Sequence, residues 1–223
     1  MELDLDSYKR FHETHFHPLD LKIDIPLFEK QMEEYSLAFR EWGGPRKNIG
    51  RYGLPLLNQN GSLHNNPEPA CYPLDIWNKE NPDNKLWYPL MAEPTEVLDL
   101  SCFDPIEDIK EYMLRSCILK WNSGANFVPH TDQTTPTEVI RLWGTNDPDN
   151  MSLRFDKSGK YVHPFDVSDT DHELIPVENV EAGRLYLIDT CMIHDATASA
   201  DNVYQFFIAL NIESLVTISS LKL

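Results

Sequence analysis

The chain has 223 residues, of which 19 are Lys or Arg and 36 are Asp or Glu, so its formal net charge at pH 7 is -17. A chain of this length can form one domain with a sizeable core, and it needs no disulfide or metal for stability alone. The negative charge repels phosphate backbones and argues against nucleic acid as a partner. No segment is apolar over the length of a bilayer, so we expect a soluble, cytoplasmic protein without a membrane partner.

The four cysteines predict buried thiols. They form no C-x-x-C pair, and each has apolar or aromatic neighbours in the sequence. Such a pattern is typical of reduced, packed cysteines and not of a disulfide framework. The residues are Cys71, Cys102, Cys117 and Cys191.

Residues 1–116 are predicted to be a helical and loop-rich part. Pro, Asn and Gly are concentrated in residues 43–84, as is typical of loops. Before them, apolar residues at helical spacing from Leu27 to Trp42 predict an amphipathic helix. Gly43-Gly44-Pro45 would end that helix, because glycine favours the C-terminal cap and proline cannot continue the helix.

A second helix is predicted from Asp104 to Arg115. Asp104 would cap its N-terminus, and Pro105 would occupy the first helical position. Ile106, Ile109 and Met113 then recur on one face, which would pack against the rest of the chain.

From residue 117 onward the pattern changes to short segments with apolar residues at every second position. Turn residues separate these segments, and no helix-length stretch lies between them. A mainly β fold, either a sandwich or a barrel, is therefore predicted, and a parallel α/β sheet is disfavoured. The predicted strands are Cys117–Trp121, Glu138–Trp143, Met151–Phe155, Lys160–Phe165, Leu174–Val177, Arg184–Ile188 and Val203–Ile212.

Two histidines and an aspartate form a candidate metal site. His130 and Asp132 are two positions apart, so in an extended segment both side chains point the same way. His194 follows a later predicted strand. Two imidazoles and one carboxylate fill one face of an octahedron and leave the other open, as is typical of non-haem Fe(II) sites. About 0.7 His-x-Asp pairs are expected by chance at this composition, so the hypothesis depends on the surrounding sequence.

The surrounding sequence has the segments 118–124 (ILKWNSG), 128–132 (VPHTD), 139–143 (VIRLW) and 181–189 (EAGRLYLID), followed by His194. Together, and with 51–56 (RYGLPL) upstream, they resemble the Fe(II)/2-oxoglutarate oxygenase superfamily, nearest to the aspartyl/asparaginyl β-hydroxylases. The resemblance implies a single oxygenase domain over 1–223. Its core, 117–223, would be a double-stranded β-helix, which is a cupin-like jelly-roll barrel, with the N-terminal helices packed on it.

The same resemblance implies Fe(II) and 2-oxoglutarate as cofactors and His130, Asp132 and His194 as the iron ligands. The distal carboxylate of 2-oxoglutarate needs a cation, since an unpaired carboxylate in a dry pocket is costly. The family implies an arginine in the final strand, where this chain has Gln205, which can donate hydrogen bonds but carries no charge. Either other residues hold the carboxylate or the oxo-acid is not the co-substrate.

Arg141 is the best substitute for the missing arginine. It follows the His130 turn on a predicted strand, amid apolar residues, and relatives also use an arginine on this strand. Its alternative role is an ordinary ion pair with an acidic neighbour. Arg154 is a weaker candidate, because Asp156 offers it a local ion pair.

The sequence thus predicts a dioxygenase that hydroxylates an aliphatic carbon. The resemblance implies a small-molecule or peptide substrate, either amino-acid-like or an Asp or Asn side chain, and the acidic surface favours a neutral or cationic one. Two alternatives stay open. One is a cupin-type isomerase or hydrolase with Zn or Mn, which the missing arginine favours, and the other is a non-catalytic jelly-roll binding protein. The oligomeric state is not indicated.

Overall fold

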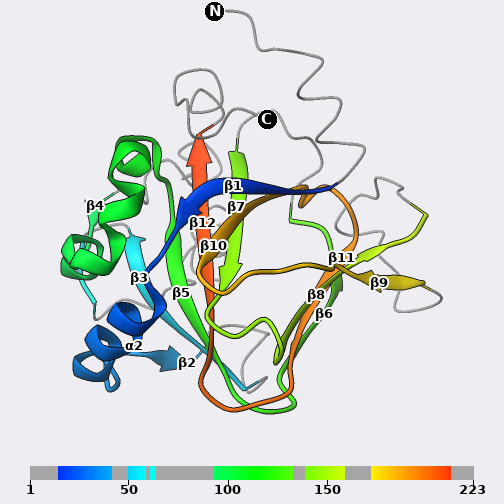
Figure 1. Ribbon diagram of the computed structural model, residues 1–223, viewed down its shortest axis with the longest axis horizontal. Helices are drawn as coiled ribbons and strands as arrows, with labels where there is room; N and C mark the ends of the chain where they lie inside the picture. The colour runs from blue at the N-terminus through cyan, green and yellow to red at the C-terminus, as the bar shows by residue number, and fades with distance from the viewer. Residues whose placement is uncertain are drawn as a thin grey trace, which may run out of the picture.

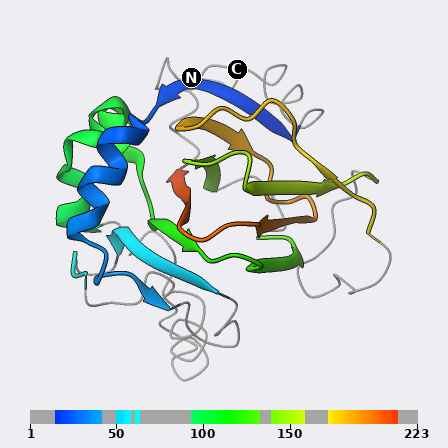
Figure 2. The same ribbon diagram turned by 60° about the horizontal axis from the view of Figure 1, so that its bottom comes forward.

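The computed structural model describes residues 15–41, 50–58, 61–63, 93–132, 139–158 and 172–211. Within these segments the protein is mainly β, and its strands form two antiparallel sheets (Figures 1 and 2). The strands are β1 (Phe16–Lys22), β2 (Arg40–Glu41), β3 (Arg51–Asn58), β4 (Glu93–Pro94), β5 (Ser116–Trp121), β6 (Asn126–His130), β7 (Val139–Thr145), β8 (Met151–Asp156), β9 (Leu174–Pro176), β10 (Arg184–Ile188), β11 (His194–Ala198) and β12 (Val203–Asn211).

The larger sheet has the strand order β1-β10-β7-β12-β5-β3-β2, with β4 paired to β3. The smaller sheet has the order β6-β11-β8-β9. Consecutive strands of the chain therefore alternate between the two sheets over most of the region from β5 to β12.

The pairing of β5 to β12 is that of a jelly roll. β5 pairs with β12, β6 with β11, β7 with β10 and β8 with β9, all antiparallel, so this part of the chain is one long hairpin. Further pairing of β12 with β7 and of β11 with β8 rolls the hairpin into two sheets. The predicted double-stranded β-helix is thereby confirmed.

The barrel interior is an apolar cluster to which both sheets contribute. Alternation along β8 shows how the cluster is built: Met151, Leu153 and Phe155 are buried in it. Since successive side chains of a strand point to opposite faces, Arg154 and Asp156 point outward. Trp121 and Trp143 supply the largest side chains from the larger sheet.

The outer face of the larger sheet is covered by helices, as Figure 2 shows. α2 (Ile25–Glu34) begins at Asp24, whose carboxylate accepts a hydrogen bond from the Leu27 N–H at 3.1 Å. The helix is shorter than predicted, because Arg40 pairs with Gly53 of β3 and the chain there is a strand. Sheet pairing overrides the helical spacing of the apolar residues. The predicted stop at 43–45 lies outside the described residues.

The second predicted helix is a 3-10 helix, η4 (Ser101–Tyr112), and a short one, η3 (Glu96–Asp99), precedes it. η4 begins before Asp104, so the predicted N-cap is wrong, and Pro105 lies inside the helix. The cap fails because the chain already turns at Leu100, whose carbonyl accepts from Phe103 N–H at 2.9 Å. Ile106 and Ile109 are fully buried, as predicted for one face of the helix.

Residues from the helices and from the outward face of the larger sheet form a second apolar cluster. This cluster holds the N-terminal part of the chain on the barrel. Its members include Phe28, Met32, Leu54, Leu56, Phe103, Ile106, Ile109, Ile118, Phe206 and Ile208.

Six of the predicted strands are present, as β5, β7, β8, β9, β10 and β12. The remaining prediction, Lys160–Phe165, lies outside the described residues. The strands β1, β3, β6 and β11 were not predicted. β1 and β3 belong to the part expected to be helical and loop-rich, yet they extend the larger sheet by pairing with β10 and β5.

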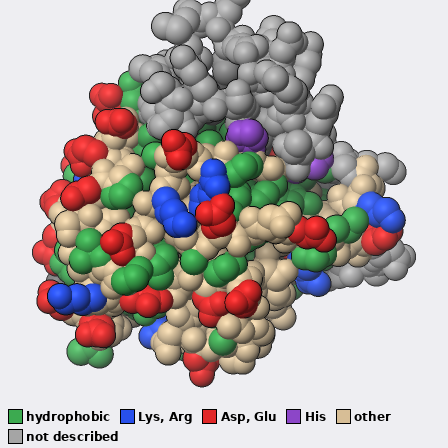
Figure 3. Space-filling view, in the orientation of Figure 1, with side chains coloured by type: hydrophobic (Ala, Val, Ile, Leu, Met, Phe, Trp, Pro, Cys, Tyr) green, Lys and Arg blue, Asp and Glu red, His purple; other side chains and the backbone are tan. Residues whose placement is uncertain are grey.

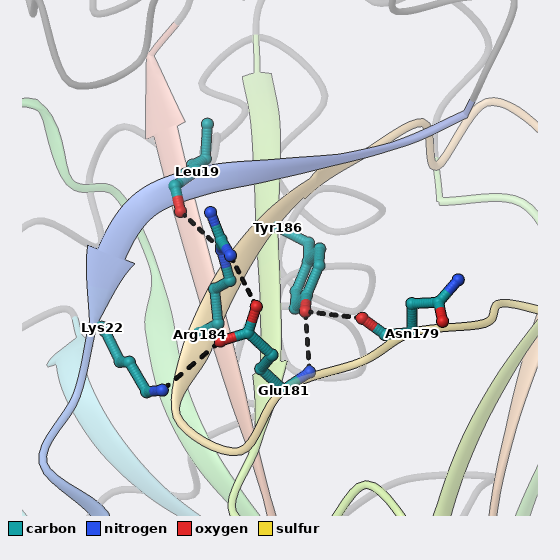
Figure 4. A network of polar contacts seen from close by, with 6 residues as sticks. All are labelled: Leu19, Lys22, Asn179, Glu181, Arg184 and Tyr186. Carbon is teal, nitrogen blue, oxygen red and sulfur yellow. Dashed lines mark hydrogen bonds and ion pairs between the residues drawn. The ribbon is translucent and has the colours of Figure 1, made fainter.

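A polar network joins β1 to the start of β10 (Figure 4). Arg184 donates to Glu181 Oε1 at 2.6 Å and to the Leu19 carbonyl at 3.0 Å, while Lys22 Nζ lies 3.4 Å from Glu181 Oε2. Tyr186 Oη accepts from the Glu181 N–H at 2.8 Å. The network fixes the turn before β10.

Two further expectations concern the thiols and the membrane. Cys102, Cys117 and Cys191 are buried, as predicted, and Cys71 lies outside the described residues. Across the described segments, no helix has the length and apolar character needed to span a bilayer.

Candidate metal centre

His130, Asp132 and His194 lie together at one end of the barrel. His130 ends β6 and His194 begins β11, and the two residues are direct partners in the antiparallel pairing. Asp132 follows β6, where its N–H donates to the Thr190 carbonyl at 2.9 Å. One potential ligand atom from each of the three side chains lies within 4.8 Å of the others. The fold thus brings together residues that are far apart in the sequence.

The orientation of both imidazoles suits metal binding. His130 Nδ1 lies 2.8 Å from the Val128 carbonyl, and His194 Nδ1 lies 2.8 Å from the Met192 carbonyl. A carbonyl only accepts hydrogen bonds, so each Nδ1 must carry a proton, and Nε2 is the ring nitrogen that can bind a metal. Metal-binding histidines are typically held in this way.

The charges of the three groups also suit a cation. Burial, with a further contribution from His130, lowers the pKa of His194 to about 4, so this imidazole is neutral at neutral pH. Burial by itself would raise the pKa of Asp132, but the neighbouring His130, whose Nε2 lies 3.4 Å from Asp132 Oδ1, and the positive charge of Arg141 outweigh it and hold the pKa well below its usual range. Metal ligands must be deprotonated to bind, and these two are.

Aromatic side chains support the histidine rings. The Phe127 ring stands edge-on to the His130 ring with centroids 4.1 Å apart. Phe155 lies beside His194, with centroids 5.9 Å apart. His194 is 5% exposed, whereas the Asp132 side chain keeps 23% of its surface accessible. The site is therefore closed on the barrel side and open at Asp132.

Arg141 lies next to this site. Its Nε is 4.0 Å from Asp132 Oδ2, and its Cζ is 5.2 Å from the centroid of the Phe207 ring. The side chain is almost fully buried. The alternative role of Arg141 is an ion pair with an acidic neighbour, and that neighbour is Asp132, which is itself a candidate metal ligand. The guanidinium is also within reach of a molecule bound at the site.

Gln205 lies deeper in the barrel. It is two positions before Phe207 on the inward face of β12 and is 7% exposed. Among the described residues, its Oε1 has no hydrogen-bond partner. A buried polar group of this kind is normally satisfied by water or a ligand.

Arg154 is not brought to the site. It points outward from β8 and makes a double contact with Asp195, of which Nε to Oδ1 measures 2.8 Å. The expected pair with Asp156 does not form, because Asp195 lies directly opposite Arg154 in the pairing of β8 with β11. Asp156 instead contacts His172 at 2.7 Å.

Two buried arginines near the site were missed. The Arg51 guanidinium lies 3.8 Å from the Phe127 ring centroid, and the Arg115 guanidinium lies 5.9 Å from that of Phe207. Both side chains are at least 95% buried. Arg115 precedes Cys117 by two positions, so the alternation of β5 could have indicated that it faces inward.

Comparisons with known proteins give distant likenesses. No family model and no curated protein matches the chain. Among solved structures it is similar to SnoN, a non-heme alpha-ketoglutarate dependent epimerase from nogalamycin biosynthesis (11% identity, TM-score 0.49, 93% of this chain and 82% of that chain). A prolyl hydroxylase from Trichoplax adhaerens, in complex with a hypoxia inducible factor peptide, is similar at 10% identity and a TM-score of 0.49. The similarity covers 95% of this chain and 90% of that chain. HygX from Streptomyces hygroscopicus, with nickel and 2-oxoglutarate bound, is similar at 12% identity and a TM-score of 0.47. The similarity covers 95% of this chain and 88% of that chain.

Proposed function

We propose that this chain is an Fe(II)- and 2-oxoglutarate-dependent oxygenase with its catalytic centre at His130, Asp132 and His194. The observation that carries the proposal is the geometry of the three side chains. Their potential ligand atoms lie within 4.8 Å of one another, and both histidines are held with Nε2 available. Two imidazoles and one carboxylate, which leave coordination positions of the metal open, are typical of non-haem Fe(II) oxygenases.

The protein's contribution would be binding and positioning. His130, Asp132 and His194 would hold the metal, and the Val128 and Met192 carbonyls keep the two imidazoles oriented. Bound Fe(II) and 2-oxoglutarate would supply the oxidising chemistry that side chains lack. The apolar interior behind the histidines would exclude water from the reacting groups.

Arg141 would bind the distal carboxylate of 2-oxoglutarate. Its position 4.0 Å from Asp132 and its burial place a permanent positive charge beside the proposed metal. Gln205 would be a further hydrogen-bond donor deeper in the barrel. The end of its side-chain amide at Oε1 has no partner among the described residues, and rotation of the amide would direct the NH₂ group there.

The proposed reaction is hydroxylation of an aliphatic carbon. The resemblance of the sequence around the ligands to the aspartyl/asparaginyl β-hydroxylases supports an amino-acid-like molecule or an Asp or Asn side chain as the substrate, free or in a peptide. Asp132 lies on the open side of the site, so the substrate would approach there.

Succinate formation tests this function. Protein with Fe(II), O₂ and 2-oxoglutarate should slowly release succinate even without the proper substrate, and Zn(II) should not replace Fe(II). Asp132→Ala should abolish the release, whereas Asp20→Ala, which removes an exposed carboxylate from β1, should not. If Fe(II) binds but wild-type protein forms no succinate, the oxygenase assignment is wrong. Zn- or Mn-dependent isomerase or hydrolase chemistry would then be favoured.

A further inference from the structure

The Phe207 ring is contacted by two arginines, one from β7 and one from the residue that precedes β5. The Cζ atom of Arg141, on β7, lies 5.2 Å from the ring centroid, and that of Arg115, just before β5, lies 5.9 Å from it. Each arginine is 4% exposed. β12 runs between β5 and β7, so the two guanidinium groups approach the ring of the central strand from both sides.

Ala209 separates the two arginines. On one side, Ala209 is the direct pairing partner of Arg141. On the other side, its carbonyl accepts from the Leu114 N–H at 2.7 Å and its N–H donates to Ser116 Oγ at 3.0 Å, so Arg115 lies opposite it. Ala209 and Phe207 share the inward face of β12. The small alanine side chain thus lies between two long cationic ones.

Arg141 connects this pair of arginines to the candidate metal centre. Arg141 Nε is 4.0 Å from Asp132 Oδ2. Phe207 is only partly buried, in contrast to its neighbours Phe206 and Ile208, which are fully buried. Trp143 is the direct partner of Phe207, and within the described part of the chain its buried indole N–H has no hydrogen-bond partner. Two guanidinium groups thus lie around a partly open ring.

We propose that Arg115 and Arg141 together form a clamp over Ala209 that binds the distal carboxylate of the oxo-acid co-substrate. The inference rests on the proposed function, and it adds Arg115 as a second binding residue. A guanidinium binds a carboxylate through two parallel hydrogen bonds, and a carboxylate between two guanidinium groups can use both oxygens on both sides.

The clamp also explains why β12 lacks the arginine that the family resemblance implies. The positive charge comes from the two strands that flank β12, and β12 itself provides the small residue between them. Such a site would strongly favour a dicarboxylic oxo-acid. A monocarboxylic one of the same length lacks the group that the two guanidinium groups would bind.

The test compares two ligands and four variants by isothermal titration calorimetry on protein loaded with Mn(II), without turnover. The ligands are 2-oxoglutarate and 2-oxopentanoate, which has the same carbon chain but no distal carboxylate. The variants are Arg115→Met, Arg115→Lys, Ala209→Leu and, as a control, Arg40→Met, which removes an exposed charge away from the barrel. The melting temperature of each variant reports whether it folds.

For 2-oxoglutarate, Arg115→Met should raise Kd by about tenfold to a hundredfold, as expected for a lost charge-assisted contact. Its Kd for 2-oxopentanoate should stay within about twofold of wild type. Arg115→Lys should retain part of the affinity, because it keeps the charge but loses the planar fork. Ala209→Leu should weaken 2-oxoglutarate binding with both arginines present, and Arg40→Met should change neither Kd.

Three outcomes would overturn the clamp. If Arg115→Met and Arg115→Lys bind 2-oxoglutarate like wild type, Arg115 has no role in binding. If they lose affinity equally for both ligands, Arg115 acts on the shared half of the molecule and not on the distal carboxylate. If wild-type protein binds Mn(II) but neither oxo-acid, the proposed function fails together with the clamp. The first two outcomes leave the proposed function intact.

Discussion

His130 and His194 face each other across the pairing of β6 with β11, with their ring centroids 4.3 Å apart. Each ring donates Nδ1–H to the carbonyl of the residue two positions before it, at 2.8 Å in both cases. The backbone of each strand therefore orients its own histidine. Since sheet pairing fixes the two strands relative to each other, the positions of both Nε2 atoms are set before any metal binds.

The first prediction concerns these two histidines. His130→Ala and His194→Ala should each lower the affinity for Mn(II) or Fe(II) by at least about 100-fold, because loss of a ligand should cost more than loss of the groups that orient it. Titration of metal-free protein by calorimetry measures this. His17→Ala, which removes a half-buried imidazole from β1, should bind metal like wild type. Metal binding that survives both alanine variants would mean that the ion binds elsewhere.

The second prediction concerns Arg154 and Asp195, an ion pair on the outer face of the smaller sheet. Asp195 is 3% exposed, so Arg154→Met should leave a buried carboxylate without its partner and lower the free energy of unfolding by about 1–3 kcal/mol. The Kd for 2-oxoglutarate should stay within about twofold of wild type. Urea denaturation and calorimetry measure the two quantities.

The double variant Arg154→Met with Asp195→Asn is the control for this pair. Removing both charges should recover part of the lost stability, because no uncompensated charge remains. A large loss of oxo-acid binding in Arg154→Met, at unchanged stability, would instead place Arg154 in the co-substrate site.

The third prediction compares two glycines with left-handed backbone conformations. Gly183 has φ +77° and Gly124 has φ +78°, so both alanine variants carry the same conformational cost of about 1–2 kcal/mol. A Cβ at Gly183 would lie 2.3 Å from the Ile23 carbonyl oxygen, whereas nothing lies within 4 Å of one at Gly124. Gly183→Ala should therefore be the more destabilising by about 2 kcal/mol or more in urea denaturation. Equal losses would contradict the close packing of this turn against the end of β1.

The fourth prediction concerns acid stability through Asp156. Burial alone would raise the pKa of Asp156, but hydrogen bonds from Ser158 and His172 outweigh it and hold the pKa below its ordinary value. A carboxyl with a lower pKa in the folded state adds stability above its unfolded pKa of about 4, and this stability is lost as the pH falls through the folded value. Wild type should thus exceed Asp156→Asn in unfolding free energy at neutral pH, and the difference should shrink below about pH 4. A difference that is constant with pH would exclude this contribution.

The sequence predicted best those strands in which apolar residues alternate regularly with polar ones. Alternation in β5, β7, β8, β10 and β12 is regular enough to predict a β-sandwich or barrel, and the family resemblance supplied the jelly roll. β6 and β11 were missed because they are short, and one contains a proline while the other has small and polar residues. These are the two strands that carry the candidate histidine ligands, and their conformation depends on pairing with each other and with β8.

For the site, the spacing of His130 and Asp132 predicts a pair on one side of an extended segment, and His194 is a candidate from its position after a later predicted strand. The resemblance joined the three residues as iron ligands. The partners of the arginines could not be predicted, because ion pairs depend on neighbouring strands. Arg154 faces Asp195 and not Asp156, since β8 pairs with β11. Arg115 faces Arg141 across Ala209, a relationship between three strands that no local pattern encodes.

The central claim is that His130, Asp132 and His194 bind Fe(II) together with 2-oxoglutarate. The most direct measurement is the visible absorption spectrum of the protein under anaerobic conditions. Fe(II) and 2-oxoglutarate together should give a weak charge-transfer band that neither gives alone, and Asp132→Ala should lose it. If wild-type protein binds Fe(II) and shows no band at saturating 2-oxoglutarate, the claim is contradicted.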